Sequence, residues 1–196
     1  MKVPIRLQQG FTLIELMVTL AIASILMLIA VPSLTTYRRN AELTSATNTL
    51  LAAINAARGE AMKRGTNAMV VPTNNGTDWN TGWVVFALGA TNTTQAYNAG
   101  TDKTVHVQSA VPTYINVVGN QSAAANPAYM MFDASGYSKT KAGGFGALTL
   151  TLTRTDVSGT SALNETRRIV IASTGRARTC KPTSASDANC AATSTQ

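Results

Sequence analysis

Two arginines near the C-terminus, Arg176 and Arg178, are the residues whose type and spacing point most directly to chemistry. They follow Gly175, and a single residue separates them. Because side chains alternate along an extended chain, both guanidinium groups would point to the same side, with Cα atoms roughly 6 to 7 Å apart. Two guanidinium groups on one side suit phosphates. The pattern Gly-Arg-x-Arg is short, so by itself it also fits a solvated basic tail or a contact with another subunit.

The distribution of charge points to the same part of the chain. The 196 residues carry sixteen Lys and Arg against nine Asp and Glu, a formal charge of +7. Residues 68–138 hold one basic and three acidic residues (−2), whereas residues 139–181 hold eight basic and two acidic residues (+6). On charge alone, Lys139, Lys141 and Lys181 join the candidate phosphate-binding residues. Phe145 is the only aromatic residue from Lys139 onward, so the sequence favours phosphate contacts over base stacking.

No group of residues in the sequence fits catalysis or a metal site. His106, the only histidine, stands between Val105 and Val107 in an alternating segment that is typical of a sheet surface. Two cysteines without Cys-x-x-Cys spacing and one histidine are too few for a zinc cluster. There is no glycine-rich phosphate loop and no nucleophile elbow. We therefore predict a protein that is not an enzyme and that needs no cofactor.

The N-terminal part of the chain is strongly apolar. Residues 11–31 contain one charged residue, Glu15, and no charge occurs from Leu16 to Tyr37. About twenty such residues can span a bilayer's hydrocarbon core as a helix. A secretory signal peptide is the alternative, because Ala21-Ile22-Ala23 resembles its cleavage site, but cutting there would leave apolar residues exposed. A carboxylate within such a segment is costly unless it stays at the interface or has a partner.

The residues around Glu15 carry a specific resemblance. Gln9-Gly10-Phe11-Thr12-Leu13-Ile14-Glu15-Leu16 resembles the leader-cleavage site of type IV pilins and type II secretion pseudopilins. The resemblance implies that a prepilin peptidase cuts after Gly10 and methylates the amino group of Phe11. It also implies that Glu15 pairs with a free N-terminal amine during filament assembly, which would offset the desolvation of both charges. Pro32 matches the proline that bends the first helix in such pilins.

The remaining pattern predicts one long helix followed by short strands, an α+β fold with a mainly antiparallel sheet on the helix's C-terminal half. The helix is expected over residues 11–64, with Gly65 as its cap, and its second half has apolar residues at spacings of three and four. The expected segments are a leader at 1–10, a membrane or filament-core half at 11–36, an amphipathic half at 37–64, a β-rich domain at 65–179 and a tail at 180–196. The strands are expected at 68–71, 83–88, 104–108, 113–118, 129–132, 147–153 and 167–172.

Cys180 and Cys190 bracket the polar tail. In an exported chain, an even pair this close most simply forms a disulfide, and a loop of about eleven residues would contribute on the order of 2 to 3 kcal/mol. Such a bridge would fix the backbone just after Arg178 and add Lys181 to the basic patch. It would equally serve as a staple for a fraying terminus.

Several further segments resemble the GspH/FimT branch of minor pilins and pseudopilins. They are Asp78-Trp79, Gly82–Phe86, Phe132–Gly136 and the last strand running into Gly175-Arg176-Ala177-Arg178. Members of this branch in naturally transformable bacteria bind DNA through a Gly-Arg-x-Arg motif in the C-terminal tail. The resemblance implies the same role for Gly175, Arg176 and Arg178, whereas Trp83 and Phe86 are expected in the core.

The resulting expectation is a minor type IV pilin that binds extracellular DNA, through its backbone phosphates, for uptake in natural transformation. Its expected partners are DNA, other major and minor pilins, the prepilin peptidase and the inner membrane. Its expected location is the bacterial inner membrane, as a single-pass protein with a periplasmic domain, and then the pilus at the cell surface. The alternative is a structural minor pilin, or a GspH-like pseudopilin of type II secretion, that does not bind DNA.

Overall fold

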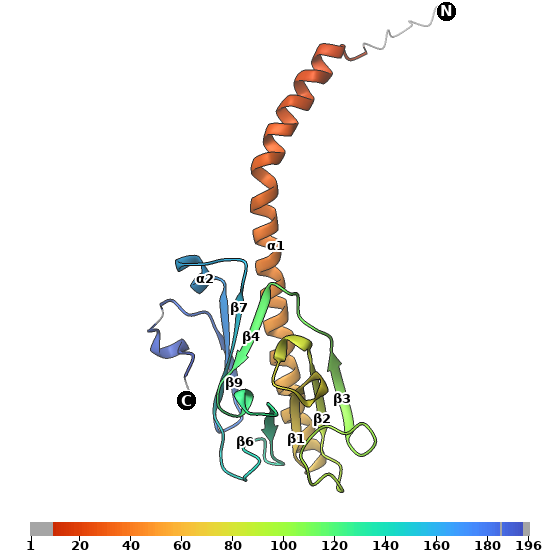
Figure 1. Ribbon diagram of the computed structural model, residues 1–196, viewed down its shortest axis with the longest axis vertical. Coiled ribbons are helices and arrows are strands. Elements are labelled where there is room, and N and C mark those ends of the chain that lie inside the picture. The colour runs from red at the N-terminus through yellow and green to blue at the C-terminus, as the bar shows by residue number, and fades with distance from the viewer. Residues whose placement is uncertain (1–9, 185, 194–196) are drawn as a thin grey trace, which may run out of the picture. The chain divides into compact units, whose positions relative to one another are not determined.

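The computed structural model describes residues 10–184 and 186–193 (Figure 1). The expected leader therefore lies outside the described residues except for Gly10. The chain divides into two units, one ending at Ala41 and the other formed by Glu42–Gln196. The long helix α1 (Leu13–Arg64) contributes to both units. It ends where predicted, because Gly65 takes a positive φ of 66° and donates its N–H to the carbonyl of Ala61.

In the first unit, α1 begins immediately after Thr12. The Oγ1 atom of Thr12 accepts a hydrogen bond of 3.3 Å from the backbone N–H of Glu15, which satisfies one of the free donors at the helix start. No single described helix is both long and apolar enough to cross a membrane, but two stretches bent by 40°, Leu13–Leu28 and Ser33–Arg64, pass that test together by length and composition. Pro32, at which a bend is expected, lies between these two stretches.

In the second unit, α1 packs against two antiparallel sheets instead of the single sheet predicted from the sequence. Sheet A has the strand order β3-β2-β1-β5-β6, and sheet B has the order β4-β7-β8-β9. Figure 1 shows the two sheets side by side along the C-terminal half of α1. The strands are β1 (Ala68–Pro72), β2 (Trp83–Ala87), β3 (Lys103–Gln108), β4 (Ile115–Gly119), β5 (Met130–Phe132), β6 (Ser138–Lys139), β7 (Leu148–Arg154), β8 (Thr166–Ile171) and β9 (Ala177–Cys180).

Short helices and turns connect the strands. The sequence did not predict strands β6 and β9, which have two and four residues, or the short helix α2. Segments this short carry no hydrophobic period of their own, so only pairing with distant partners stabilises them. The short helices are η1 (Thr73–Asn75), η2 (Trp79–Thr81), η3 (Gln121–Ala124), α2 (Thr160–Asn164) and η4 (Ala188–Cys190).

One apolar core joins α1 to both sheets. The sequence predicts an apolar helix face at six positions, which are the five named below and Ala46. Five of the six are buried, and Ala46 is half-buried. In the sequence, leucine and threonine alternate over residues 148–153, which predicts a half-buried strand. Leu148, Leu150 and Leu152 of β7 in sheet B do lie in the same core. Trp83 is buried in this core, and Phe86 is buried in a second cluster on the opposite face of sheet A. The buried members of the helix face are Leu43, Leu50, Ile54, Ala57 and Ala61.

The long loop between β2 and β3 covers the second cluster. Tyr97 packs its ring 5.1 Å from that of Phe86. The buried carboxylate of Asp102 holds this loop closed, because it accepts hydrogen bonds from the backbone N–H groups of Gly89 and Asn98 and from the side chain of Asn92. Its partners are all within the loop, so Asp102 stabilises the fold. His106 is exposed on β3, as predicted.

Candidate nucleic-acid interface

The Gly-Arg-x-Arg segment lies at the turn that joins β8 to β9. These strands pair antiparallel, with Ile171 opposite Ala177 and Val170 opposite Arg178. Within the turn, Gly175 donates its N–H to the carbonyl of Ala172 over 2.8 Å, and Ala172 donates to the carbonyl of Arg176 over 3.0 Å. Arg176 therefore leaves the turn immediately before β9, and Arg178 lies within that strand.

Gly175 is required by geometry. Its φ is +78°, which L side chains rarely adopt, and a Cβ atom at this position would lie 1.8 Å from the carbonyl oxygen of Gly136. The same oxygen accepts a hydrogen bond of 2.9 Å from Nε of Arg58 on α1. The turn thus packs directly against the β5–β6 connection and α1. Gly175 is buried, so it positions the arginines and offers little surface to a ligand.

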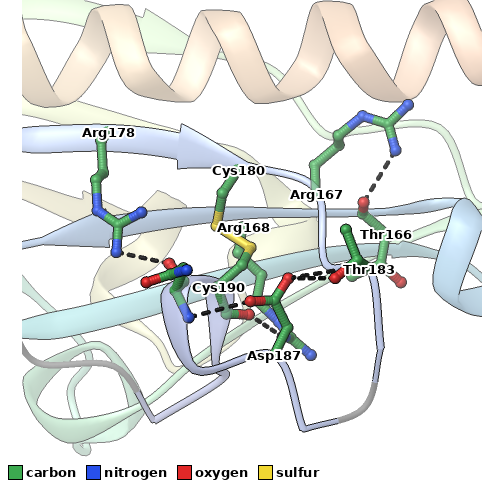
Figure 2. Close-up of a disulfide and its surroundings, with 9 residues drawn as sticks. Thr166, Arg167, Arg168, Arg178, Cys180, Thr183, Asp187 and Cys190 are labelled. Carbon is green, nitrogen blue, oxygen red and sulfur yellow. Dashed lines mark hydrogen bonds between the residues drawn. A yellow bond between two sulfur atoms is a disulfide. The ribbon is translucent and has the colours of Figure 1, made fainter.

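The two arginines have different environments. Arg176 is exposed, and its side chain has no hydrogen bond or ion pair among the described residues. Arg178 is half-buried, and its Nη2 atom donates a hydrogen bond of 2.7 Å to the carbonyl of Asn189 (Figure 2). The sequence could not predict this difference, because the partner of Arg178 belongs to the tail. Arg176 is the freely available cation, whereas Arg178 is a cation of fixed position.

The tail after β9 folds back as a closed loop. Cys180 and Cys190 form the predicted disulfide, with their Cα atoms 5.8 Å apart. The buried guanidinium of Arg168 donates to the carbonyl of Cys190, and Nδ2 of Asn120 donates to the carbonyl of Ala192 over 3.0 Å. Two side chains of sheet B, Arg168 and Arg178, and Asn120 just after β4 therefore hold tail carbonyls.

Asp187 organises the inside of this loop. Its carboxylate accepts hydrogen bonds from the backbone N–H and the hydroxyl of Thr183 and from the N–H of Asn189 (Figure 2). These bonds, chiefly those from Thr183, lower the pKa of Asp187. Lys181 is exposed on the same loop and has no side-chain partner among the described residues.

Lys139 and Lys141 belong to sheet A and its edge. Nζ of Lys139 lies 3.7 Å from Oδ2 of Asp133, and Nζ of Lys141 lies 4.8 Å from the centre of the Tyr129 ring. Burial lowers the pKa of Lys141. The two sheets meet here, because the N–H of Ser138 donates to the carbonyl of Ser173 over 3.1 Å. The fold thus brings the β6 edge beside the β8–β9 turn, although 35 residues separate them in sequence.

Besides some of the candidate residues, the other three of the eight C-terminal cations also have partners within the fold. Arg154 is buried and donates hydrogen bonds to the carboxylate of Asp156, the shorter over 2.6 Å, and Glu165 lies 3.8 Å away. The hydrogen bonds to Asp156 raise the pKa of Arg154. Arg167 donates to the carbonyls of Asn164 and Thr166. Arg168 is buried beneath the tail. Fewer cations of residues 139–181 are therefore available to a ligand at the surface than the count of eight in the sequence indicates.

Two exposed aromatic residues beside this surface were missed as functional candidates. Phe145 and Tyr137 contact each other, and the ammonium group of Lys139 lies over the Phe145 ring. The sequence contains a signal for this surface, because Tyr137, Lys139 and Lys141 are spaced two residues apart. In an extended chain this spacing places one aromatic and two basic side chains on the same face.

The residues predicted for processing and assembly lie at the start of the first unit. Gly10 and Phe11 are exposed and precede α1, and Glu15 is exposed in the first helical turn. Among the described residues, no group of three or more His, Cys, Asp or Glu side chains is arranged to hold a metal ion.

Comparison with protein families gives two matches. Residues 46–175 match the family model described as type II transport protein GspH, which is more than half of the chain. The chain belongs to the GspH family. Residues 5–31 match the prokaryotic N-terminal methylation motif, which contains Gly10, Phe11 and Glu15. A GspH-family chain with this motif is a minor pilin or pseudopilin, a class that is processed by a peptidase, anchored through its N-terminal helix and assembled with other pilins.

Solved structures confirm the fold. The type IV minor pilin FimU of Pseudomonas aeruginosa aligns with a TM-score of 0.55 at 18% identity, over 76% of this chain and 98% of that chain. The minor pseudopilin EpsH from the type 2 secretion system of Vibrio cholerae aligns with a TM-score of 0.51 at 13% identity, over 73% of this chain and 99% of that chain. No curated protein matches this sequence. The GspH match ends at Gly175, so Arg176 and the tail lie beyond it.

Proposed function

We propose that this GspH-family protein is a minor type IV pilin that binds extracellular DNA without sequence specificity, for uptake in natural transformation. The observation that carries the proposal is Arg176, an exposed guanidinium without a partner among the described residues, on a turn that Gly175 holds in place. Such a cation is ready to bind a phosphate, because no internal ion pair has to be broken.

The neighbouring cations support the same proposal. Lys181 is exposed immediately after the end of β9. Arg178, between Arg176 and Lys181 in the chain, is held in place by one hydrogen bond and has further N–H donors on its guanidinium. Lys139 and Lys141 add positive charge from the adjacent edge of sheet A. Three to five phosphate contacts correspond to a slope of log K against log salt of about −3 to −4.5. Binding by one subunit is therefore weak, and several subunits or other pilins in a filament would strengthen it through avidity.

The N-terminal proposals concern assembly. Cleavage after Gly10 would leave Phe11 as a methylated N-terminus and Glu15 as the fifth residue of the mature chain. The Glu15 carboxylate would then pair with a free amine of another pilin. Before assembly the protein would reside in the inner membrane with a periplasmic domain, and afterwards in the pilus.

A DNA titration at several salt concentrations tests the binding proposal. The chain, purified in detergent micelles, is compared with Arg176→Gln and with Lys103→Gln as a matched control. Lys103 is an exposed cation on β3, at the opposite edge of sheet A from β6. Lys103→Gln therefore removes one positive charge, as Arg176→Gln does, but at a site away from the arginine turn. We expect Arg176→Gln to weaken binding and to reduce the salt slope by about 1, whereas Lys103→Gln retains the slope. Absence of binding at low salt, or equal binding by both variants, would contradict the proposal.

A structural role without DNA binding is the second candidate. The observation that favours it is the edge strand β3, on which Val105 and Val107 are exposed. An exposed apolar edge strand is suited to a protein contact. Substitution of both valines by Ser would then prevent incorporation into a filament and, because it does not change the net charge, leave the DNA titration unchanged.

A further inference from the structure

An exposed aromatic pair lies at the β6 edge of sheet A. Phe145 is 63% exposed and Tyr137 is 42% exposed. Their ring centres are 5.5 Å apart, and their planes make an angle of 69°. The ammonium group of Lys139 lies 3.8 Å from the centre of the Phe145 ring. Two large apolar side chains therefore remain in solvent within a positively charged environment.

The backbone holds Phe145 in this position. Phe145 forms an antiparallel bridge with Lys139, and a tight turn joins them. In this turn, Gly143 donates its N–H to the carbonyl of Thr140, and Thr140 donates to the carbonyl of Gly144, each over 2.9 Å. Gly143 has a φ of +87°, which requires glycine. The ring of Phe145 is thus presented by a defined hairpin.

The aromatic pair is connected to the arginine turn. Gly136, which precedes Tyr137, is in backbone contact with Gly175, which precedes Arg176. The hydrogen bond from the N–H of Ser138 to the carbonyl of Ser173 joins the same two segments. Tyr137 and Arg176 are therefore each the next residue after one of the two glycines whose backbones are in contact. The segments that carry the aromatic pair and the exposed guanidinium of Arg176 are therefore neighbours in the fold.

The chemistry of this surface fits a nucleobase better than another protein. Its charges are Lys139, Lys141 and Arg176 against Asp133, a sum of +2. Lysine is depleted in the cores of protein interfaces, yet here the ammonium group of Lys139 lies over one face of the Phe145 ring. Nucleic-acid sites without sequence preference combine aromatic rings, on which bases stack, with cations that follow the phosphates. An intact duplex cannot use such rings, because its bases are already stacked on one another.

We propose that Phe145 and Tyr137 form a stacking site for unpaired nucleobases, so that this protein prefers single-stranded DNA and open ends over intact duplex. This inference rests on the proposed DNA-binding function and extends it from phosphates to bases. Arg176 holds the phosphate next to the stacked base, and Lys139 and Lys141 add attraction to the following phosphates. The stacking is independent of sequence, since every base has an aromatic face.

The test uses the chain in detergent micelles and three DNA probes. The probes are a twelve-residue oligothymidylate, a strand of equal length in which abasic sites replace the central bases, and a duplex of twelve base pairs closed by loops at both ends. Fluorescence anisotropy measures binding by the wild type, Phe145→Leu, Phe145→Tyr and Arg176→Gln. Leucine keeps the apolar volume at position 145 and removes the ring face, whereas tyrosine retains the ring.

We expect the wild type to bind oligothymidylate about five- to tenfold more tightly than the abasic strand. Phe145→Leu should remove this preference and leave affinity for the closed duplex unchanged, and Phe145→Tyr should behave like the wild type. Arg176→Gln should weaken binding to all three probes and keep the preference for the strand with bases.

Other results would overturn the stacking proposal. If Phe145→Leu leaves all three affinities unchanged, or lowers them equally, the rings do not stack on bases. Unchanged affinities together with poor incorporation into filaments would identify the pair as a contact with another pilin. In these cases weakening by Arg176→Gln would still support the DNA-binding function, whereas absence of binding to every probe would overturn both proposals.

Discussion

Substitution of Gly175 by alanine gives a sharp test of how the arginine turn is built. Two independent effects act at this position. The φ of +78° costs a residue with a Cβ atom about 1 to 2 kcal/mol. The new Cβ would also lie 1.8 Å from the carbonyl oxygen of Gly136, so the two backbones must separate by roughly 1.5 Å to reach an ordinary contact distance.

This separation is opposed by the surrounding structure. The Gly136 carbonyl accepts a hydrogen bond from Arg58, and Nε of Arg58 lies only 3.0 Å from the same Cβ position. Overpacking of this kind typically costs about 1 to 3 kcal/mol. The two effects together predict a loss of about 2 to 5 kcal/mol in the free energy of unfolding. In a domain of this size the melting temperature would fall by about 5 to 20 °C.

The assay is thermal and denaturant unfolding of a fragment from Arg38 to Gln196, which keeps the whole buried core described above. Gly65→Ala is the matched control, because Gly65 has a similar φ of +66° but a Cβ there would meet nothing within 4 Å. It should lose only about 1 to 2 kcal/mol. If the two variants are equally stable, the close contact between the turns does not constrain the fold and our explanation of Gly175 is wrong.

Three further predictions concern assembly and the tail. Glu15→Ala should prevent incorporation into pili while the second unit stays folded, and normal incorporation, measured in sheared pilus fractions, would exclude the proposed pairing role. Replacing both Cys180 and Cys190 by serine should free the tail from Arg168 and Arg178 and make residues 181–193 sensitive to limited proteolysis. The free energy of unfolding should fall by about 2 to 3 kcal/mol. Unchanged protection from proteolysis would show that the hydrogen bonds hold the tail without the disulfide. Hydrogen bonds from Thr183 lower the pKa of Asp187 below its usual value of 3.8. The ionised carboxylate of Asp187 therefore stabilises the folded tail above pH 3.8, and this stabilisation is lost as the pH falls through the lower pKa of the folded state. The amide resonance of Asn189 should therefore shift only below about pH 4, and should show no such transition in Asp187→Asn.

Much of the fold could be predicted from local patterns. The helix and its cap at Gly65 follow from apolar spacing and from a residue that tolerates positive φ. The Leu–Thr alternation over residues 148–153 correctly identified three leucines of β7 as core residues, although Thr149 on the other face is also buried. The division into two sheets was not predicted, because sheet membership depends on pairing between strands far apart in the chain, such as β1 with β5.

The sequence by itself determined which chemistry is available, since it placed two arginines after a glycine, bracketed the tail with two cysteines and put a carboxylate in an apolar segment. Only the tertiary structure decided how these groups are used. Arg178 is bound by a carbonyl eleven residues away, Gly175 contacts Gly136, and Tyr137 comes to lie beside the arginine turn. Each of these contacts joins segments that are separate in sequence. Residue type and spacing specify local conformation, but the partners of a side chain are set by the packing of the whole domain.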